Sequence, residues 1–144
     1  MVFQEIISTV REELDKEILS PPLLFVLAAD LLQYIINQAT SAAALTRPLS
    51  HTDSQDFPVI QYADDTLLIM NASPTELAHL KDLLHTFSLS TGLKVNHAKS
   101  CLLPINLSTE GATSLAQLFG CQVGSFPFTY LGLPMGTTRP RVED

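Results

Sequence analysis

The chain is poor in positively charged residues. Its 144 residues include eight Lys or Arg against 15 Asp or Glu, which gives a formal net charge of −7 at pH 7. The cations are scattered, and only Arg139 and Arg141 lie close together in the sequence. Because phosphate contacts require clustered Lys and Arg side chains, this composition argues against a free-standing nucleic-acid-binding protein. We expect weak or no nucleic-acid binding by this chain.

Cysteine is also scarce. Cys101 and Cys121 are too far apart in the sequence for a local metal motif, and no second ligand pair follows His97 and Cys101 at zinc-finger spacing. Reduced, buried thiols are the ordinary state of two such residues, although the fold could still bring them together. The sequence therefore gives no support for a zinc site.

A long uncharged apolar run is missing as well. Residues 21–39 are strongly apolar but carry Asp30 and Gln33, whereas a membrane span needs about 20 mostly apolar residues with few or no charges. The N-terminal region has early acidic residues, Glu5 and Glu12 among them, and does not resemble a secretory signal. We expect no membrane association.

The length and the apolar content of 46% suit one compact domain, or part of one. Apolar residues recur at helical spacing over residues 2–18, which predicts an amphipathic N-terminal helix, and a mostly apolar, central helix is expected over residues 23–39. Ser73-Pro74-Thr75-Glu76 has the pattern of a capping box, so a third helix should begin there and end at Gly92. A fourth helix is predicted from residue 108 or 109 to residue 119. The core residues expected on the last two helices are Leu77, Leu80, Leu84, Phe87, Ala112, Leu115, Leu118 and Phe119.

The segment Gln61-Tyr62-Ala63-Asp64-Asp65-Thr66 places two adjacent carboxylates between two strand-like apolar runs. This pattern predicts a β-hairpin that reverses at or near the Asp pair. Asp is a common turn residue, so the pair could serve the turn alone. Two ionised carboxylates this close repel each other unless one is protonated or a cation lies between them. Oxygen ligands on short side chains favour Mg²⁺ in that position.

The string Tyr-x-Asp-Asp between two apolar strands resembles the catalytic hairpin of reverse transcriptases. Three further blocks, residues 19–32, 92–100 and 126–134, resemble the polymerases of non-LTR (LINE-type) retrotransposons, particularly those of plants. The four blocks follow the family's order. The resemblance implies an α+β fold, a partial reverse-transcriptase palm over residues 19–136. Residues 1–18 would then be a non-matching helix and residues 137–144 a C-terminal tail.

The resemblance also implies roles for single residues. Asp64 and Asp65 would be catalytic carboxylates that bind Mg²⁺ in a two-metal site, and Tyr62 would pack beside the primer terminus. Tyr130-Leu131-Gly132 would steady the primer strand, although the same residues are equally consistent with a plain edge hairpin. Lys99 would protonate the departing pyrophosphate, with a solvated loop lysine as the alternative.

The family's third metal-binding carboxylate, which comes from an earlier strand, has no counterpart here. Neither Asp15, in a charge-rich segment, nor Asp30, in the apolar segment, is a credible replacement. We therefore expect this chain to be inactive alone, whereas the intact parent would copy an RNA template onto a DNA primer from dNTPs, in the nucleus. The missing strand would also leave a sheet edge and an apolar face uncovered, which predicts self-association.

Two other hypotheses remain open for this chain. It could be a non-catalytic binding or scaffold remnant in which the Asp pair is a vestige, or the product of a pseudogene with no selected function. Divalent-metal binding would separate a residual polymerase site from a pure scaffold.

Overall fold

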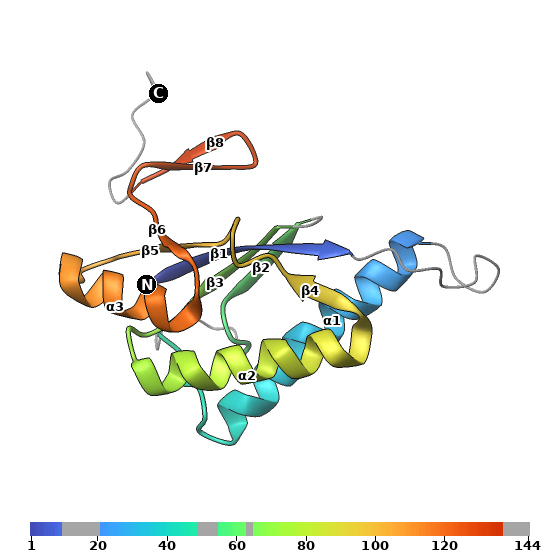
Figure 1. Ribbon diagram of the computed structural model, residues 1–144. Coiled ribbons are helices and arrows are strands. Elements are labelled where there is room, and N and C mark those ends of the chain that lie inside the picture. The colour runs from blue at the N-terminus through green and yellow to red at the C-terminus, as the bar shows by residue number, and fades with distance from the viewer. Residues whose placement is uncertain (10–20, 49–54, 63–64, 137–144) are drawn as a thin grey trace.

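A computed structural model describes residues 1–9, 21–48, 55–62 and 65–136, and it shows a mixed sheet with helices on one face and a separate hairpin on the other (Figure 1). The helices are α1 (Pro21–Ser41), α2 (Pro74–Thr91) and α3 (Thr109–Phe119). The strands are β1 (Val2–Thr9), β2 (Val59–Tyr62), β3 (Asp65–Ile69), β4 (Leu93–Val95), β5 (Cys101–Leu103), β6 (Gln122–Val123), β7 (Phe128–Tyr130) and β8 (Leu133–Met135).

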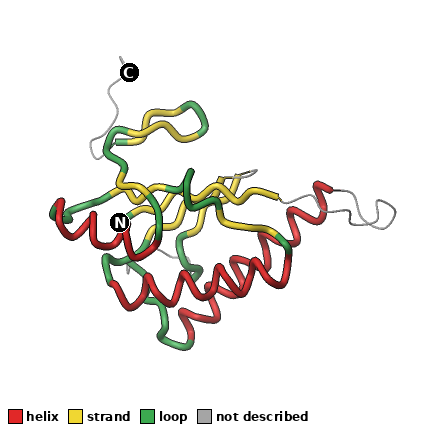
Figure 2. Tube along the Cα trace, viewed as in Figure 1, coloured by secondary structure: helices red, strands yellow, loops and turns green. Residues whose placement is uncertain are grey.

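The main sheet has the strand order β2-β3-β1-β5-β6, and β4 pairs with the far end of β1 (Figure 2). Strands β2 and β3 form the predicted antiparallel hairpin, in which Tyr62 pairs with Asp65 and Val59 with Leu68. Strand β1 runs antiparallel to β3 on one side and to β5 on the other. Only β5 and β6 pair in parallel, with α3 as their connection. An α+β class is therefore correct for this fold.

The prediction of a helix over residues 2–18 is wrong for its first part, because residues 2–9 form strand β1. Residues 10–18 lie outside the described part of the chain. The segment is rich in β-branched residues, Val2, Ile6 and Ile7 among them, which favour extended backbone. Strands on both sides supply hydrogen-bond partners along β1, and this tertiary pairing overrides a weak helical periodicity. A missing first strand was expected to leave a sheet edge uncovered, whereas β1 pairs with β3 on one side and with β5 on the other.

The ends of α2 follow from local side-chain chemistry. Ser73 caps the helix by accepting a hydrogen bond from the Glu76 backbone N–H at 3.3 Å, and Gly92 ends it in the left-handed conformation at φ 75°. The reciprocal half of the capping box is absent. Instead, the carboxylate of Glu76 accepts hydrogen bonds from the backbone N–H and the hydroxyl of Thr46, at 3.0 and 2.8 Å. Glu76 therefore ties the loop that follows α1 to the start of α2.

The main hydrophobic core lies between the sheet and the helices. Leu68 and Leu102 contribute from the sheet, and the predicted α2 residues Leu77, Leu80, Leu84 and Phe87 are all buried. On α3 the prediction is correct for Ala112, Leu115 and Phe119, but Leu118 is exposed and Ala116 is buried in its place. The helix turns by about 100° per residue. Leu118 and Ala116 are two residues apart, so they lie on nearly opposite sides of the helix, and only one of them can face the core.

A smaller apolar cluster covers the other face of the sheet. Val2, Leu67 and Leu103 are its buried members, and Phe126 and Phe128 pack against it from the segment that leads into the β7–β8 hairpin. The two phenylalanine rings meet edge to face, with their centroids 5.5 Å apart. The prediction that Phe126 and Phe128 share one side is thus confirmed, and Tyr130 is buried but is not a member of this cluster.

Cys101 and Cys121 are both half-buried and are not joined in a disulfide, and Cys101 packs on the smaller apolar cluster while Cys121 packs on the main core. Burial raises the pKa of the Cys101 thiol. Among the described helices, none combines the length and the hydropathy that a membrane crossing requires.

Candidate functional site

The Asp-Asp hairpin places one carboxylate at a clearly described position. Asp65 is the first residue of β3, is half-buried, and pairs with Tyr62 at the end of β2. The Tyr62 side chain is 61% exposed, so an aromatic ring lies open to solvent beside this carboxylate. Ala63 and Asp64 lie outside the described residues, so the predicted role of Asp64 stays a prediction.

Asp65 lies on the same sheet face as the smaller apolar cluster. Side chains alternate along a strand, so Asp65 shares its face with Leu67 and Ile69, both of which belong to that cluster. The β7–β8 hairpin lies over this face of the sheet (Figure 1). Asp65 and the Tyr-Leu-Gly block, which are far apart in the sequence, therefore lie on the same side of the sheet.

Tyr130 lies within electrostatic range of Asp65. Tyr130 is 7% exposed, and its hydroxyl is buried without a hydrogen-bond partner among the described residues. Burial raises the pKa of the Tyr130 phenol, and the negative charge of Asp65 raises it further. No hydrogen bond joins the two side chains in the described structure, so Asp65 acts on Tyr130 through its charge.

The neighbouring strand contributes no carboxylate opposite Asp65. The residue that pairs with Asp65 across the β1–β3 ladder is Ile6, and the acidic residue Glu5 pairs with Thr66. Directly paired positions in an antiparallel ladder belong to the same face, and adjacent positions belong to opposite faces. Glu5 therefore occupies a position on the other face from Asp65. This relationship could not be predicted from a helix over residues 2–18, because a helix has no partner strand.

These donors fit a single weakly held cation better than a two-metal centre. In the described residues, no group of three or more His, Cys, Asp or Glu side chains gathers where it could hold a metal ion. One or two carboxylates are enough for Mg²⁺, which fills its remaining positions with water and phosphate oxygens. Asp65, with Asp64 beside it in the sequence, could supply those ligands. A two-metal centre needs more protein ligands than the described residues bring here, so we derive no catalytic step through it.

The structure does not bring Lys99 to this carboxylate. Lys99 is exposed on the turn between β4 and β5, where its backbone N–H donates to the backbone and side-chain oxygens of Asn96, at 3.0 and 3.3 Å. Strand β1 lies between these strands and β3 in the sheet. No ion pair between Lys99 and Asp65 is formed within the described structure. The geometry agrees with the alternative of a solvated loop lysine, with Asn96 as the cap of the turn.

The tip of the β7–β8 hairpin combines strain with exposed apolar surface. Leu131 and Gly132 have φ of 52° and 79°, and positive φ at both central residues is the signature of a type I′ turn. Leucine rarely adopts this conformation because of its Cβ. The Leu131 side chain is nevertheless 48% exposed, and Leu133 next to the turn is more exposed still. The tip therefore presents aliphatic side chains to solvent at a cost in backbone strain.

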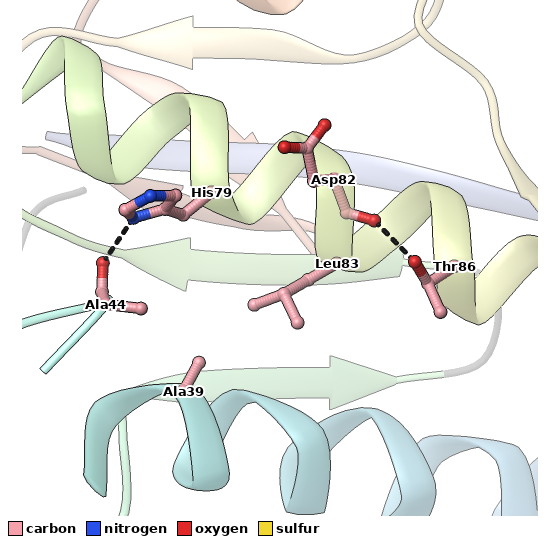
Figure 3. A pocket seen from close by; sticks show the side chains of 6 residues that line it. All are labelled: Ala39, Ala44, His79, Asp82, Leu83 and Thr86. Carbon is pink, nitrogen blue, oxygen red and sulfur yellow. Dashed lines mark hydrogen bonds between the residues drawn. The ribbon is translucent and has the colours of Figure 1, made fainter. Parts of the chain in front are cut away.

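A small pocket lies on the other side of the sheet, between the end of α1 and the middle of α2 (Figure 3). Its volume is about 250 Å³, and its lining residues are Ala39, Ala44, His79, Asp82, Leu83 and Thr86. The His79 Nδ1 lies 3.0 Å from the Ala44 carbonyl oxygen, and the Asp82 carboxylate points away from Ala39. Ligand pockets usually enclose about 300 Å³ or more with converging polar groups. This pocket has neither feature and lies apart from Asp65.

Comparison with known proteins adds no family to this geometry. No protein-family model, no curated protein and no solved structure matches the chain. The functional proposal below is therefore carried by the residues and by their arrangement in the fold.

Proposed function

We propose that this chain is part of the palm of a LINE-type reverse transcriptase, an RNA-directed DNA polymerase that uses Mg²⁺ in its intact form. The observation that carries the proposal is the meeting of two polymerase-like motifs on one face of the sheet. Asp65 of the Tyr-x-Asp-Asp hairpin lies close enough to Tyr130 of the Tyr-Leu-Gly block for its charge to raise the pKa of the phenol. In the sequence these two motifs are separated by α2, α3 and three strands, β4, β5 and β6.

The chemistry of this face suits a primer terminus. The exposed Tyr62 ring supplies a stacking surface for a base or a sugar, and the exposed Leu131 side chain at the hairpin tip supplies a further apolar surface. The carboxylates of Asp64 and Asp65 would hold Mg²⁺, whose bound form supplies a positive charge to phosphate oxygens. RNA template, DNA primer and dNTP would be ligands of the intact polymerase.

In isolation, the chain is proposed to be catalytically inactive. The β1 position opposite Asp65 is aliphatic, so the described neighbouring strand does not supply a further carboxylate to the same face. With a net charge of −7 and no cluster of cations, the chain also lacks the phosphate contacts that would hold a template–primer duplex.

Divalent-metal titration tests the residual site. We expect the wild-type chain to bind Mn²⁺ weakly, as measured by electron paramagnetic resonance, and Asp64→Asn or Asp65→Asn to abolish this binding. Asp82→Asn on α2 is the matched control and should leave Mn²⁺ binding unchanged. If all three variants bind Mn²⁺ like the wild type, the Asp pair has no metal role and a non-catalytic scaffold becomes the better description.

Primer extension tests the activity. With an annealed RNA template and DNA primer, dNTPs and Mg²⁺, the purified chain should give no extended product. Extension that is lost in Asp64→Asn would overturn the proposed inactivity and would support the polymerase assignment at the same time. An independent test is the genomic DNA upstream of the reading frame, where an in-frame or decayed remainder of a polymerase gene is expected.

A further inference from the structure

Helix α1 carries apolar side chains on two opposite sides. Leu32, Ile36 and Ala39 are buried against the main core. At about 100° per residue, the opposite side of the helix holds five large apolar residues, each between 39% and 59% exposed. We call this surface the α1 strip, and it consists of Leu23, Val26, Leu27, Leu31 and Tyr34. The expectation that α1 would be central and covered on most sides is wrong for this side.

A single charge lies within the α1 strip. Asp30 is the only charged residue in α1, is exposed, and lies one turn after Val26 and one turn before Tyr34. The helix contains no Lys or Arg, and no ion pair to Asp30 occurs within the described structure. An apolar strip with one unpaired negative charge at its centre is chemically complementary to an apolar surface with one positive charge.

We propose that the α1 strip is a docking surface for an amphipathic helix of another polypeptide, with a Lys or Arg of that helix opposite Asp30. The strip extends over about 17 Å, or three helical turns, which suits a partner with apolar residues at positions i, i+4 and i+7. Residues at these spacings form a ridge that packs into the groove of a facing helix. The proposal goes beyond the polymerase assignment and does not depend on it.

A second copy of this chain fits the α1 strip less well. Leu, Val and Tyr side chains exposed to about half of their area leave roughly 400 Å² of apolar surface in all. Two such strips would bury roughly 800 Å² together, which is less than the 1,000 Å² or more of a specific interface. Pairing α1 with itself would also introduce a second Asp30 and no cation, because α1 has none. A foreign helix would bury a similar area and would also bind weakly, so it is the charge of Asp30 that favours a different, cationic partner over a second copy.

Two synthetic helical peptides test the proposal. Both are blocked at their ends, span about four turns and share one leucine strip, and they differ only in a central Lys or Glu. By isothermal titration calorimetry, the wild-type chain should bind the Lys peptide about two- to five-fold more tightly than the Glu peptide, since exposed charge pairs contribute modestly. Asp30→Lys should reverse this preference, and Leu27→Gln should weaken the binding of both peptides.

Leu89→Gln is the matched control, because Leu89 is a solvent-exposed leucine on α2, outside the α1 strip. It should bind both peptides like the wild type, and circular dichroism melts should show that all variants are folded. Equal affinity for the two peptides in both the wild type and Asp30→Lys would overturn the proposal. Sedimentation equilibrium gives a second test. A wild-type dimer that is dissociated by Leu27→Gln and not by Leu89→Gln would also overturn the proposal, because the α1 strip would then bind a second copy of the chain.

Discussion

Ile6 of β1 pairs with Asp65 of β3 across the antiparallel ladder, so the position nearest to this carboxylate on the neighbouring strand is aliphatic. Strand β1 thus fills the centre of the sheet, and within the described residues 2–9 it has no acidic residue at a position that pairs with Asp65. Glu5 is adjacent in the sequence, but the pleat places its position on the opposite face. A shift of one residue in register decides whether a carboxylate can join Asp65.

The first prediction concerns a metal site completed by design. Ile6→Asp places a carboxylate opposite Asp65 on the same face, with Cβ atoms about 5 Å apart. We expect Mn²⁺ to bind about ten-fold more tightly than to the wild type, because affinity for hard cations rises with the number of charged ligands. The variant should be less stable than the wild type without metal and should regain stability when Mn²⁺ is added, as measured by thermal unfolding. Glu5→Gln should leave Mn²⁺ binding unchanged, and an equal effect of both substitutions would contradict the register.

The second prediction concerns the central position of β1. Gln4 pairs with Leu67 on one side and Cys101 on the other, so its backbone lies between two strands of the sheet. Gln4→Pro removes a backbone donor and constrains φ in a central strand, and we expect a loss on the order of 3 kcal/mol in the free energy of unfolding. Gln4→Thr keeps the N–H group and should retain wild-type stability within about 0.5 kcal/mol. Urea unfolding measures the stability of both variants. If Gln4→Pro were as stable as the wild type, β1 would not be a central strand.

The third prediction concerns the buried Tyr130 hydroxyl. A buried donor without a partner costs about 1–3 kcal/mol, so Tyr130→Phe should leave the stability at pH 7 unchanged or raise it by about 1 kcal/mol. The raised pKa of Tyr130 means that the folded state holds the phenol proton more tightly than the unfolded chain does. This contribution is fully present below the unfolded pKa of about 10 and is lost as pH rises through the higher folded pKa.

Urea unfolding at pH 7 and at several values above pH 10 measures this difference. The wild type should lose more stability over that interval than Tyr130→Phe, which has no phenol to ionise. Asp65→Asn removes the charge that helps raise the pKa of Tyr130. The stability of this variant should therefore decline less steeply above pH 10 than the stability of the wild type. Parallel declines in the wild type and Tyr130→Phe would show that the phenol ionises as freely in the folded state as in the unfolded chain.

The fourth prediction concerns the strained turn at the β7–β8 tip. Leu131→Asn creates Asn-Gly, the pair best suited to a turn with positive φ at both central residues. We expect a gain of about 1 kcal/mol in the free energy of unfolding, because Asn tolerates this conformation better than Leu. Leu131→Ala removes the same exposed side chain but keeps a Cβ without the compensating amide, so it should bring no such gain. If both substitutions changed the free energy of unfolding equally, the cause would be the loss of an exposed apolar side chain and not the relief of backbone strain.

Much of the local structure was predictable. The ends of α2 depend on Ser73 and Gly92, whose capping interactions reach only three or four residues along the chain. The β2–β3 hairpin depends on two apolar runs around a short polar turn, and the paired strands are separated by only two residues. In each of these elements, the decisive contacts are made within a short stretch of sequence.

Other features depend on contacts between distant segments. Residues 2–9 have apolar residues at spacings that suit either a helix or a strand, and the choice is made by pairing with β3 and β5. On α3, the spacing alone did not decide between Leu118 and Ala116 for the core side. The Glu76 side chain does not complete the capping box with the Ser73 backbone N–H, and the reason is again a distant contact. Its carboxylate accepts hydrogen bonds from Thr46, in the loop after α1.

Local sequence is sufficient for the helices α2 and α3, the Asp-Asp hairpin and the C-terminal hairpin, because caps, turns and apolar periodicity act over a few residues. Tertiary structure alone decided that β1 completes the sheet, that Ile6 and not Glu5 lies opposite Asp65, that Tyr130 lies near that carboxylate, and that one apolar side of α1 stays open. These outcomes depend on register and on burial between segments far apart in the chain, and no single stretch of sequence contains both partners.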